Sequence, residues 1–479
     1  MTTNAKPLDF STFHNVINNE LTTTTETRHG INPANTQPNP LVPVSTQDDL
    51  DKAVKAARDA FKGWSKTSFE ERRKALHAWA DAIEANADGF AKTLTMEQGK
   101  PLSQSSQEVG LASVWIRGLA ALEITENVIE ETEDRKIVQR HTPIGVVGAI
   151  VPWNFPVLLA VGKIVSAVYT GNTVIVKPSP FTPYCDLKLI ELATNFFPPG
   201  VMQCLSGDES LGPLFTAHPQ IDKISFTGSI LTGKRVMAAC AATLKRVTLE
   251  LGGNDPAIVC DDVDIDAVIP KIGILSYLCS SQVCMMIKRL YVHEKIYDEF
   301  LDKLVTFVKT LKVGDGTEAD TFFGPVQNQM QFEKAKELLS SISAGNLKAA
   351  LGGSIEKSSG YYIHPTIIDN PPETSRVVQE EPFAPILPIL KWSDEEDVLA
   401  RANALDTGLG ASVWSKDYER GTRMANQLEA GVVWLNSHFD VLPNVPFGGH
   451  KQSGMGVEWG LAGLLEYCNS QTQWLKKSF

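Results

Sequence analysis

The sequence lacks the features that indicate a disulfide-stapled, zinc-binding or membrane-spanning protein. Its seven cysteines are an odd number scattered over 479 residues, and none forms a Cys-x-x-Cys pair. Such scattering predicts neither a disulfide framework nor a zinc site, and it indicates a reducing compartment. The one long uncharged run, residues 144–162, contains Pro152 and Pro156. Two prolines in such a run argue against a bilayer-spanning helix.

Positive charge is also scarce. The chain has 44 lysines and arginines against 56 aspartates and glutamates, a formal net charge of −12. This balance repels nucleic-acid phosphates and anionic membranes, so we expect neither as a partner. Residues 1–10 lack the charged-then-apolar pattern of a signal peptide, and we therefore expect a cytoplasmic protein. The length predicts two or three substructures.

The pattern of apolar residues predicts a doubly wound α/β fold. Amphipathic helices are expected at residues 49–62 and 69–94. Short apolar strands broken by glycine, proline and serine then alternate with helical stretches from residue 144 onward. The expected strands cover residues 173–176, 223–226, 246–249, 256–260, 289–292, 384–391, 410–414 and 431–435. The distinctive polar residues follow strand ends, and ligands bind at that edge of an open parallel sheet.

Three residues point to chemistry at a carbonyl carbon. Cys284 is a candidate nucleophile, and Glu250 precedes a Gly-Gly turn as a candidate base. Asn154 is the strong side-chain donor of a loop that two prolines stiffen. A thiolate that attacks a carbonyl creates an oxyanion, which needs such a donor. A free thiol has a pKa of about 8.5, so Cys284 needs local help to ionise.

The chain closely resembles the aldehyde dehydrogenase superfamily along nearly its whole length. The resemblance rests on motifs that occur in family order. They are Phe13-x-Asn15-x-Ile17-Asn18, Gly30-Ile31-Asn32-Pro33, Glu97-Gln98-Gly99-Lys100, Pro152-Trp153-Asn154-Phe155-Pro156, Gly171-Asn172-Thr173, Lys177-Pro178-Ser179, Phe226-Thr227-Gly228-Ser229, Glu250-Leu251-Gly252-Gly253, Gln282-x-Cys284, Glu381-Pro382-Phe383 and Pro446-Phe447-Gly448-Gly449-x-Lys451-x-Ser453-Gly454.

The resemblance implies a Rossmann-type cofactor domain, an α/β catalytic domain and a small β oligomerisation element. The cofactor-binding domain would comprise residues 1–125, 142–252 and 446–465, and the catalytic domain residues 253–445. Residues 126–141 and 466–479 would form the oligomerisation element. Their alternating pattern leaves strand edges that suit subunit contacts, so we expect a homodimer or homotetramer.

The resemblance also assigns roles to residues. Cys284 would be the nucleophile, Glu250 the base for the deacylating water, and Asn154 with the Cys284 backbone N–H the oxyanion hole, while Glu458 would pass protons to and from the base. NAD or NADP would accept the hydride. The expected cofactor contacts are Trp153, Lys177, Ser179, Pro180, Gly228, Ser229, Gly233, Leu251, Glu381 and Phe383. The expected substrate contacts are Phe155, Gly162, His438 and Phe447. No metal is expected.

The chain departs from the family pattern at four of these places. Cys279 stands where relatives usually have asparagine. Ser281 stands where they have glycine, and if the backbone there needs a positive φ, serine would be strained. Pro180 replaces a glutamate that binds ribose in many NAD-preferring members, so NADP should be tolerated beside NAD. Gly162 replaces a tryptophan of the substrate tunnel, which predicts a preference for bulky aldehydes over acetaldehyde.

Two other functions stay open at this point. The chain could be a catalytically degenerate binding or structural protein, because Cys279 and Ser281 alter the nucleophile's own loop. It could also be a cysteine hydrolase that cleaves esters or thioesters without redox chemistry, although no convincing Cys-His-Asn set accompanies Cys284. Labelling of Cys284 by a thiol probe tests the first alternative, and dependence of the reaction on NAD(P) tests the second.

Overall fold

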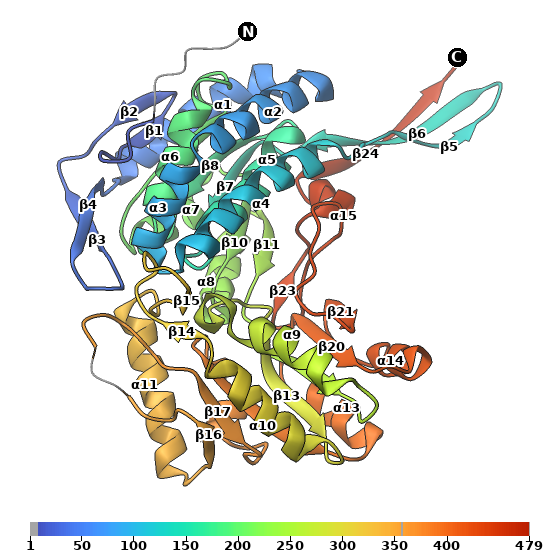
Figure 1. Ribbon diagram of the computed structural model, residues 1–479. Helices are drawn as coiled ribbons and strands as arrows, with labels where there is room; N and C mark the ends of the chain where they lie inside the picture. Colours follow the sequence, from blue (N-terminus) through green and yellow to red (C-terminus); the bar gives the residue numbers. More distant parts are fainter. Residues whose placement is uncertain (1–7, 356–357, 479) are drawn as a thin grey trace.

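The computed structural model describes residues 8–355 and 358–478 (Figure 1). Residues 1–7 of the expected cofactor domain and Phe479 of the expected oligomerisation element lie outside the described residues. Figure 1 shows two α/β lobes, one containing the blue and green segments and one the yellow and orange segments, with a long β arm that projects from the first lobe.

The first lobe is built on an eight-stranded sheet with the order β2-β1-β9-β8-β7-β10-β11-β23. The strands are β1 (Asn15–Ile17), β2 (Glu20–Thr22), β7 (Val146–Ile150), β8 (Thr173–Lys177), β9 (Met202–Cys204), β10 (Lys223–Thr227), β11 (Arg246–Glu250) and β23 (Gly454–Met455). The strands from β9 to β11 are all parallel, and their chain order across the sheet is 3-2-1-4-5. This is the Rossmann order, whose direction reverses between β7 and β10. Dinucleotides bind beyond the carboxyl ends of the strands at that point.

Helices cover both faces of this sheet. They are α1 (Gln47–Trp64), α2 (Phe69–Ala85), α3 (Ala87–Gln98), α4 (Leu102–Ala120), α5 (Pro156–Tyr169), α6 (Tyr184–Ala193), α7 (Leu211–Ala217) and α8 (Ile230–Ala241). The prediction of a single helix over residues 69–94 is wrong, because Asn86 separates α2 from α3 and caps both helices. The Asn86 side chain donates to the Ala82 carbonyl at 2.8 Å, and asparagine competes in this way with the backbone bonds of a continuing helix.

The second lobe contains a seven-stranded sheet with the order β16-β17-β18-β13-β12-β20-β21. Its strands are β12 (Asp255–Val259), β13 (Ile287–His293), β16 (Ala349–Leu351), β17 (Thr366–Asp369), β18 (Ile386–Trp392), β20 (Gly410–Trp414) and β21 (Val432–Leu435). All neighbours except β16 and β17 are parallel. The accompanying helices are α9 (Ile265–Tyr277), α10 (Tyr297–Val308), α11 (Gln329–Ala344), α12 (Arg376–Gln379), α13 (Glu395–Asn403) and α14 (Tyr418–Ala425). The predicted strands of both lobes are therefore confirmed, with ends that differ by a few residues.

The projecting arm is a three-stranded antiparallel sheet of β5 (Asn127–Glu131), β6 (Arg135–Pro143) and β24 (Cys468–Lys476). The register runs from Cys468 opposite Pro143 to Lys476 opposite Arg135. Ile129 and Trp474 keep more than half of their surface exposed, at 57% and 64%. The two segments grouped from sequence do lie together, but their role in assembly and the three domain boundaries stay predictions.

Within residues 8–355 and 358–478, no helix combines the length and the apolar character that a bilayer crossing requires. The same part of the chain contains no group of three His, Cys, Asp or Glu side chains arranged to hold a metal ion.

Candidate active site

Cys284 opens onto an apolar pocket with a cavity volume of about 100 Å³. Asn154 lines the same pocket, and the loop after β7 and the loop before β13 thus bring the predicted nucleophile and donor together. The remaining lining residues are Gln104, Gln107, Glu108, Leu111, Phe155, Leu158, Leu159, Leu278, Val283, Met285, Phe439, Val441 and Trp459. Most of these side chains are aliphatic or aromatic, so the pocket suits an apolar group attached to the reacting carbonyl.

The loop before Cys284 has an unusual backbone. The short 3-10 turn η1 (Leu278–Ser281) contains Cys279, Ser280 and Ser281 at φ values of 53°, 53° and 58°. Left-handed conformations cost roughly 1–2 kcal/mol per non-glycine residue. Side-chain bonds hold this loop, since Ser280 Oγ donates to the Gly324 carbonyl at 2.8 Å and Ser281 Oγ to the Ser276 carbonyl at 2.6 Å. The serine hydroxyl thus supplies a bond that glycine would not have made.

The Cys284 thiol is poorly solvated. Burial raises the pKa of Cys284 to about 12, with smaller raising contributions from Glu381, Asp255 and Glu250, while Lys288 lowers it. This shift favours the protonated thiol at neutral pH. Any nucleophilic step needs a charge that favours the thiolate.

Asn154 is buried, and its backbone and side chain are both tethered. Its side-chain nitrogen donates to the Gln282 carbonyl at 2.9 Å, which leaves its second N–H for another acceptor. Lys100 Nζ donates to the Asn154 carbonyl at 2.8 Å and forms a buried ion pair with Glu108. Glu108 in turn accepts bonds from the Val157 and Leu158 backbone N–H groups at the start of α5. The Lys100–Glu108 pair, which the sequence analysis did not identify as functional, therefore fixes the donor loop.

Glu250 ends β11 as a buried carboxyl group without a hydrogen-bond partner for either oxygen among the described residues. Burial raises the pKa of Glu250 well above its usual range, and the negative charge of Glu458 raises it further, against a lowering effect of Lys163. Glu458 is itself buried, forms an ion pair with Lys163 and accepts a bond from Ser225 Oγ at 2.8 Å. A base with a raised pKa beside a second carboxylate can take and pass on a proton.

Lys163 is a functional candidate that the sequence analysis missed. Its Nζ also contacts Ser225 Oγ at 3.0 Å, so one buried ammonium joins helix α5, strand β10 and Glu458. The sequence feature that identifies it is that Lys163 is the single charged residue of α5. A lysine in an otherwise apolar buried helix needs a counter-ion.

The predicted cofactor residues cluster at the carboxyl ends of β7, β8 and β10. Lys177 is buried, burial lowers its pKa to about 8, and its Nζ contacts the Pro178 carbonyl at 2.9 Å. Ser229 is the N-cap of α8, where free backbone N–H groups favour an anion. The rings of Trp153 and Phe383 meet edge to face at 5.3 Å. A cation, a helix start and paired aromatic rings at the Rossmann crevice fit a dinucleotide.

Two of the glycine cofactor candidates lie against apolar side chains in this region. A Cβ added to Gly233 would lie 2.5 Å from a methyl group of Leu251, and one added to Gly228 would lie 2.6 Å from the Phe226 ring. A side chain at either position would therefore force the Leu251 or Phe226 side chain to move. Ser179 is buried beside Pro180, and its hydroxyl accepts from the Phe181 N–H at 3.3 Å.

The structure corrects part of the substrate prediction. Gly162 does not open space, because a Cβ at this position would lie 2.7 Å from Nε1 of Trp459, whose indole lines the pocket. His438 is not a substrate contact, since it is buried and bonded to Ser412 Oγ at 2.9 Å and the Met285 carbonyl at 3.0 Å. Phe447 lies behind Trp459 at a ring distance of 5.2 Å and is absent from the pocket wall. Of the four predicted contacts, Phe155 lines the pocket.

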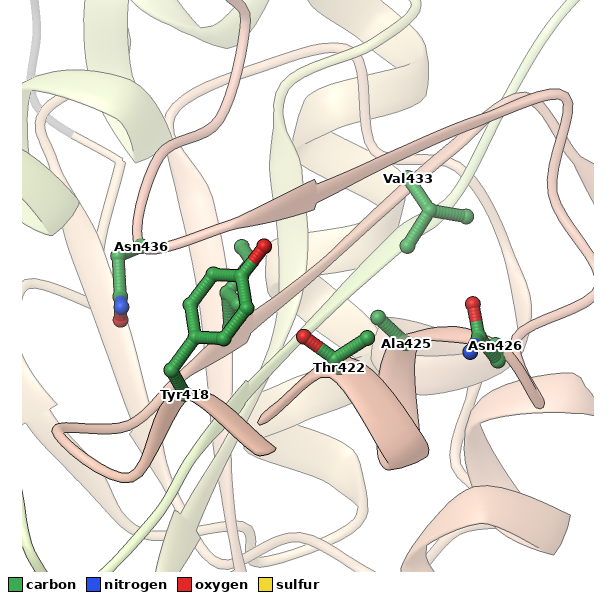
Figure 2. A pocket seen from close by; sticks show the side chains of 7 residues that line it. Tyr418, Thr422, Ala425, Asn426, Val433 and Asn436 are labelled. Carbon is green, nitrogen blue, oxygen red and sulfur yellow. The ribbon is translucent and has the colours of Figure 1, made fainter. Parts of the chain in front are cut away.

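A second hollow lies between α14 and β21, where Tyr418, Thr422 and Asn426 face Val433 and Asn436 (Figure 2). It has a volume of about 420 Å³, but none of the candidate catalytic or cofactor residues lines it. The pocket at Cys284 is therefore the one that the chemistry favours.

Comparison with known proteins agrees with this geometry. The model of the aldehyde dehydrogenase family matches residues 21–473. A putative aldehyde dehydrogenase, FUS7, from Gibberella fujikuroi is 42% identical over 98% of this chain and 100% of its own length. Retinaldehyde dehydrogenase 3 from Rattus norvegicus is 39% identical over 89% of this chain and 85% of its own.

Solved structures are similarly close. Betaine aldehyde dehydrogenase from Staphylococcus aureus in complex with NAD+ has a TM-score of 0.95 and 32% identity, covering 98% of this chain and 96% of its own. An NADP-dependent enzyme from E. coli also has a TM-score of 0.95 and 32% identity, with 98% of both chains covered.

Proposed function

Because the chain belongs to the aldehyde dehydrogenase family and is therefore an oxidoreductase that acts on aldehydes, we propose that it oxidises a bulky apolar aldehyde to the carboxylic acid with NAD or NADP. The observation that carries this proposal is the pocket in which Cys284 and Asn154 meet beneath an apolar wall. Glu250 lies at the end of β11 as the base.

The proposed reaction has two stages at Cys284. The Cys284 thiol releases its proton to solvent, and the thiolate attacks the aldehyde carbon. The remaining Asn154 N–H together with the Cys284 backbone N–H stabilises the oxyanion, a contribution typically worth roughly 2.7–4 kcal/mol. The bound nicotinamide supplies the hydride acceptor. Collapse of the oxyanion leaves a thioester on Cys284. Glu250 then takes a proton from water as the water attacks this thioester, and Glu458, paired with the Lys163 ammonium, receives that proton from Glu250. The C–S bond breaks, the carboxylic acid is released, and Cys284 leaves as the thiolate.

The cofactor would lie across the switch point of the first sheet. In this assignment Lys177 holds the adenosine ribose, Ser229 and Gly228 approach the pyrophosphate, and Glu381 with Phe383 positions the nicotinamide half. The domain division at residues 253 and 445, a cytoplasmic location and a homodimer or homotetramer formed through the β arm belong to the same proposal.

The pocket favours an apolar group larger than a methyl group. A cavity of roughly 150 Å³ with apolar walls holds benzene, and the pocket measures about 100 Å³, so a short branched chain fits as it stands and a ring needs some movement of the lining side chains. Such a group is bulky beside acetaldehyde, although Trp459 rather than open space at Gly162 shapes the pocket. One relative is named for retinaldehyde as its substrate, which supports an aldehyde larger than acetaldehyde. A panel of aliphatic and aromatic aldehydes, followed by reduced-cofactor absorbance, tests this proposal, which fails if none is oxidised.

Adding one methyl group at Gly162 should narrow the specificity. The Cβ of a Gly162→Ala variant meets Trp459 at 2.7 Å and displaces the indole into the pocket. We expect kcat/KM for aromatic aldehydes to fall by about tenfold or more, the usual effect of one methylene in a tight pocket, with little change for acetaldehyde. The double variant Gly162→Ala/Trp459→Leu should recover the aromatic substrates. Equal loss for all aldehyde sizes contradicts this role of Trp459.

NADP should be accepted beside NAD, because the 2′-phosphate would meet cations here. Pro180 provides no carboxylate, its carbonyl accepts from Arg28 Nη1 at 2.5 Å, and Lys177 lies close to Arg28. The nearby Asp208 carboxylate accepts bonds from the Ser210 N–H and Oγ on one oxygen, and its negative charge partly offsets these cations. We expect kcat/KM with NADP to lie within about a hundredfold of kcat/KM with NAD. This ratio corresponds to a free-energy difference of about 2.7 kcal/mol between the two cofactors. Calorimetric titration should show that Arg28→Met weakens NADP binding and spares NAD; equal weakening of both contradicts the assignment.

A further inference from the structure

Lys288, the second residue of β13, is a buried ammonium group at the junction of the site's loops. Its side chain is 2% exposed. Its Nζ donates to the Cys284 carbonyl at 2.5 Å and to the Gly253 carbonyl at 2.8 Å, and it lies 2.9 Å from Glu381 Oε1. The same nitrogen is 5.7 Å from the centre of the Phe383 ring.

These partners come from three separate segments. Cys284 carries the nucleophile, Gly253 follows Glu250 in the turn after β11, and Glu381 lies between α12 and β18. An ammonium has three N–H donors, and all three directions are used here. Lys288 thus holds the peptide after Cys284 in a fixed position relative to two other segments. One is the turn that follows Glu250, and the other contains Glu381, which is predicted to contact the nicotinamide half of the cofactor.

The charges that face the Cys284 thiol are mostly acidic. Glu250, Asp255 and Glu381 oppose the thiolate, and Lys288 favours it. Burial raises the pKa of Asp255 to about 8, so this group is largely neutral at neutral pH. Glu381 is therefore the carboxylate that competes with Cys284 for the charge of Lys288.

We propose that Lys288 is a positioning residue that sets the reactivity of Cys284: its ammonium stabilises the thiolate and holds the nucleophile loop, and Glu381 moderates that charge. This inference rests on the proposed function, because it concerns the same nucleophile. It adds a residue that no motif identified.

The test is the pH dependence of Cys284 alkylation by iodoacetamide without cofactor or aldehyde, measured on the Cys284 peptide by mass spectrometry. In Lys288→Met the alkylation rate at fixed pH values between about 7 and 9 should fall about tenfold or more, the usual effect of losing a close opposite charge. Lys288→Arg keeps the charge and should stay within about threefold of wild type. Glu381→Gln should accelerate the alkylation, because the competing charge is gone.

Lys188→Met is the matched control, since Lys188 is also a buried lysine with one carboxylate partner, Glu191, on helix α6. Its alkylation profile should equal that of wild type. An unchanged profile in Lys288→Met, or slower alkylation in both Lys288→Met and Glu381→Gln, overturns the inference. If Lys288→Met does not fold, the alkylation rates of Glu381→Gln and Lys288→Arg still test the inference, because slower alkylation in Glu381→Gln contradicts it. The proposed function fails separately, when wild type shows this alkylation pattern but oxidises no aldehyde.

Discussion

Replacement of Cys284 by alanine is expected to abolish NAD(P)H production from every aldehyde. The thiol is the group that bonds to the carbonyl carbon, and removal of an enzyme nucleophile commonly lowers kcat by a factor on the order of 10⁴–10⁶. The other six cysteines are buried, so none can take over the reaction. Initial rates with the best aldehyde of the panel, at saturating cofactor, provide the measurement. Cofactor affinity from calorimetry should be unchanged within about threefold, or about 0.65 kcal/mol.

Cys279→Ala is the control for this variant. Cys279 is a fully buried thiol in the same loop, and its sulfur lies 3.9 Å from Gln98 Oε1. The Cys279→Ala variant should keep most of the wild-type turnover rate. Residual NAD(P)H production in Cys284→Ala would contradict the mechanism. Thioester hydrolysis by wild type without NAD(P) would instead support a cysteine hydrolase, and cofactor binding without preferential Cys284 labelling would support a degenerate protein.

The residues whose positions the sequence predicted well are those that short local patterns determine. Glu250 and Lys177 end strands, Ser229 begins a helix, and Asn154 lies in a loop that prolines flank. Such positions depend on a few neighbouring residues, and the Rossmann order then gathers the strand ends at one crevice. The described geometry places these side chains where that reasoning expects them, and their individual roles stay predictions.

Side-chain partners from distant segments could not be predicted in this way. Lys163 and Glu458 lie 295 residues apart in the sequence but form one buried ion pair. Gly162 predicts open space because it replaces a tryptophan of the family pattern, but Trp459, which is equally remote in the sequence, lies against it. The sequence predicts His438 as a substrate contact, yet both of its ring nitrogens are bonded, one to Ser412 Oγ and one to the Met285 carbonyl. In each case packing between segments, which no local motif encodes, determined the outcome.

Replacement of Glu250 by glutamine is expected to stop the second stage while the first stage continues. Thiolate attack and hydride transfer do not require this carboxylate, so about one NAD(P)H should form per active subunit before turnover stalls. Loss of a general base usually lowers the rate by a factor on the order of 10²–10⁴. Stopped-flow absorbance gives the burst, and mass spectrometry of the Cys284 peptide should show the retained acyl group. A linear progress curve near the wild-type rate would contradict the assignment.

The pH profile of the same step follows from the burial of Glu250. A protonated carboxyl group cannot accept a proton from water, and burial together with Glu458 keeps the pKa of Glu250 raised. Deacylation in wild type should therefore be slow at low pH and rise as pH passes through that raised value. In Glu458→Gln the like charge is removed while Lys163 keeps its charge, so the rise should move to lower pH. If the rise of the deacylation rate moves to higher pH in Glu458→Gln, then Glu458 does not oppose ionisation of Glu250. If the deacylation rate of Glu250→Gln still rises with pH, then another group accepts the proton.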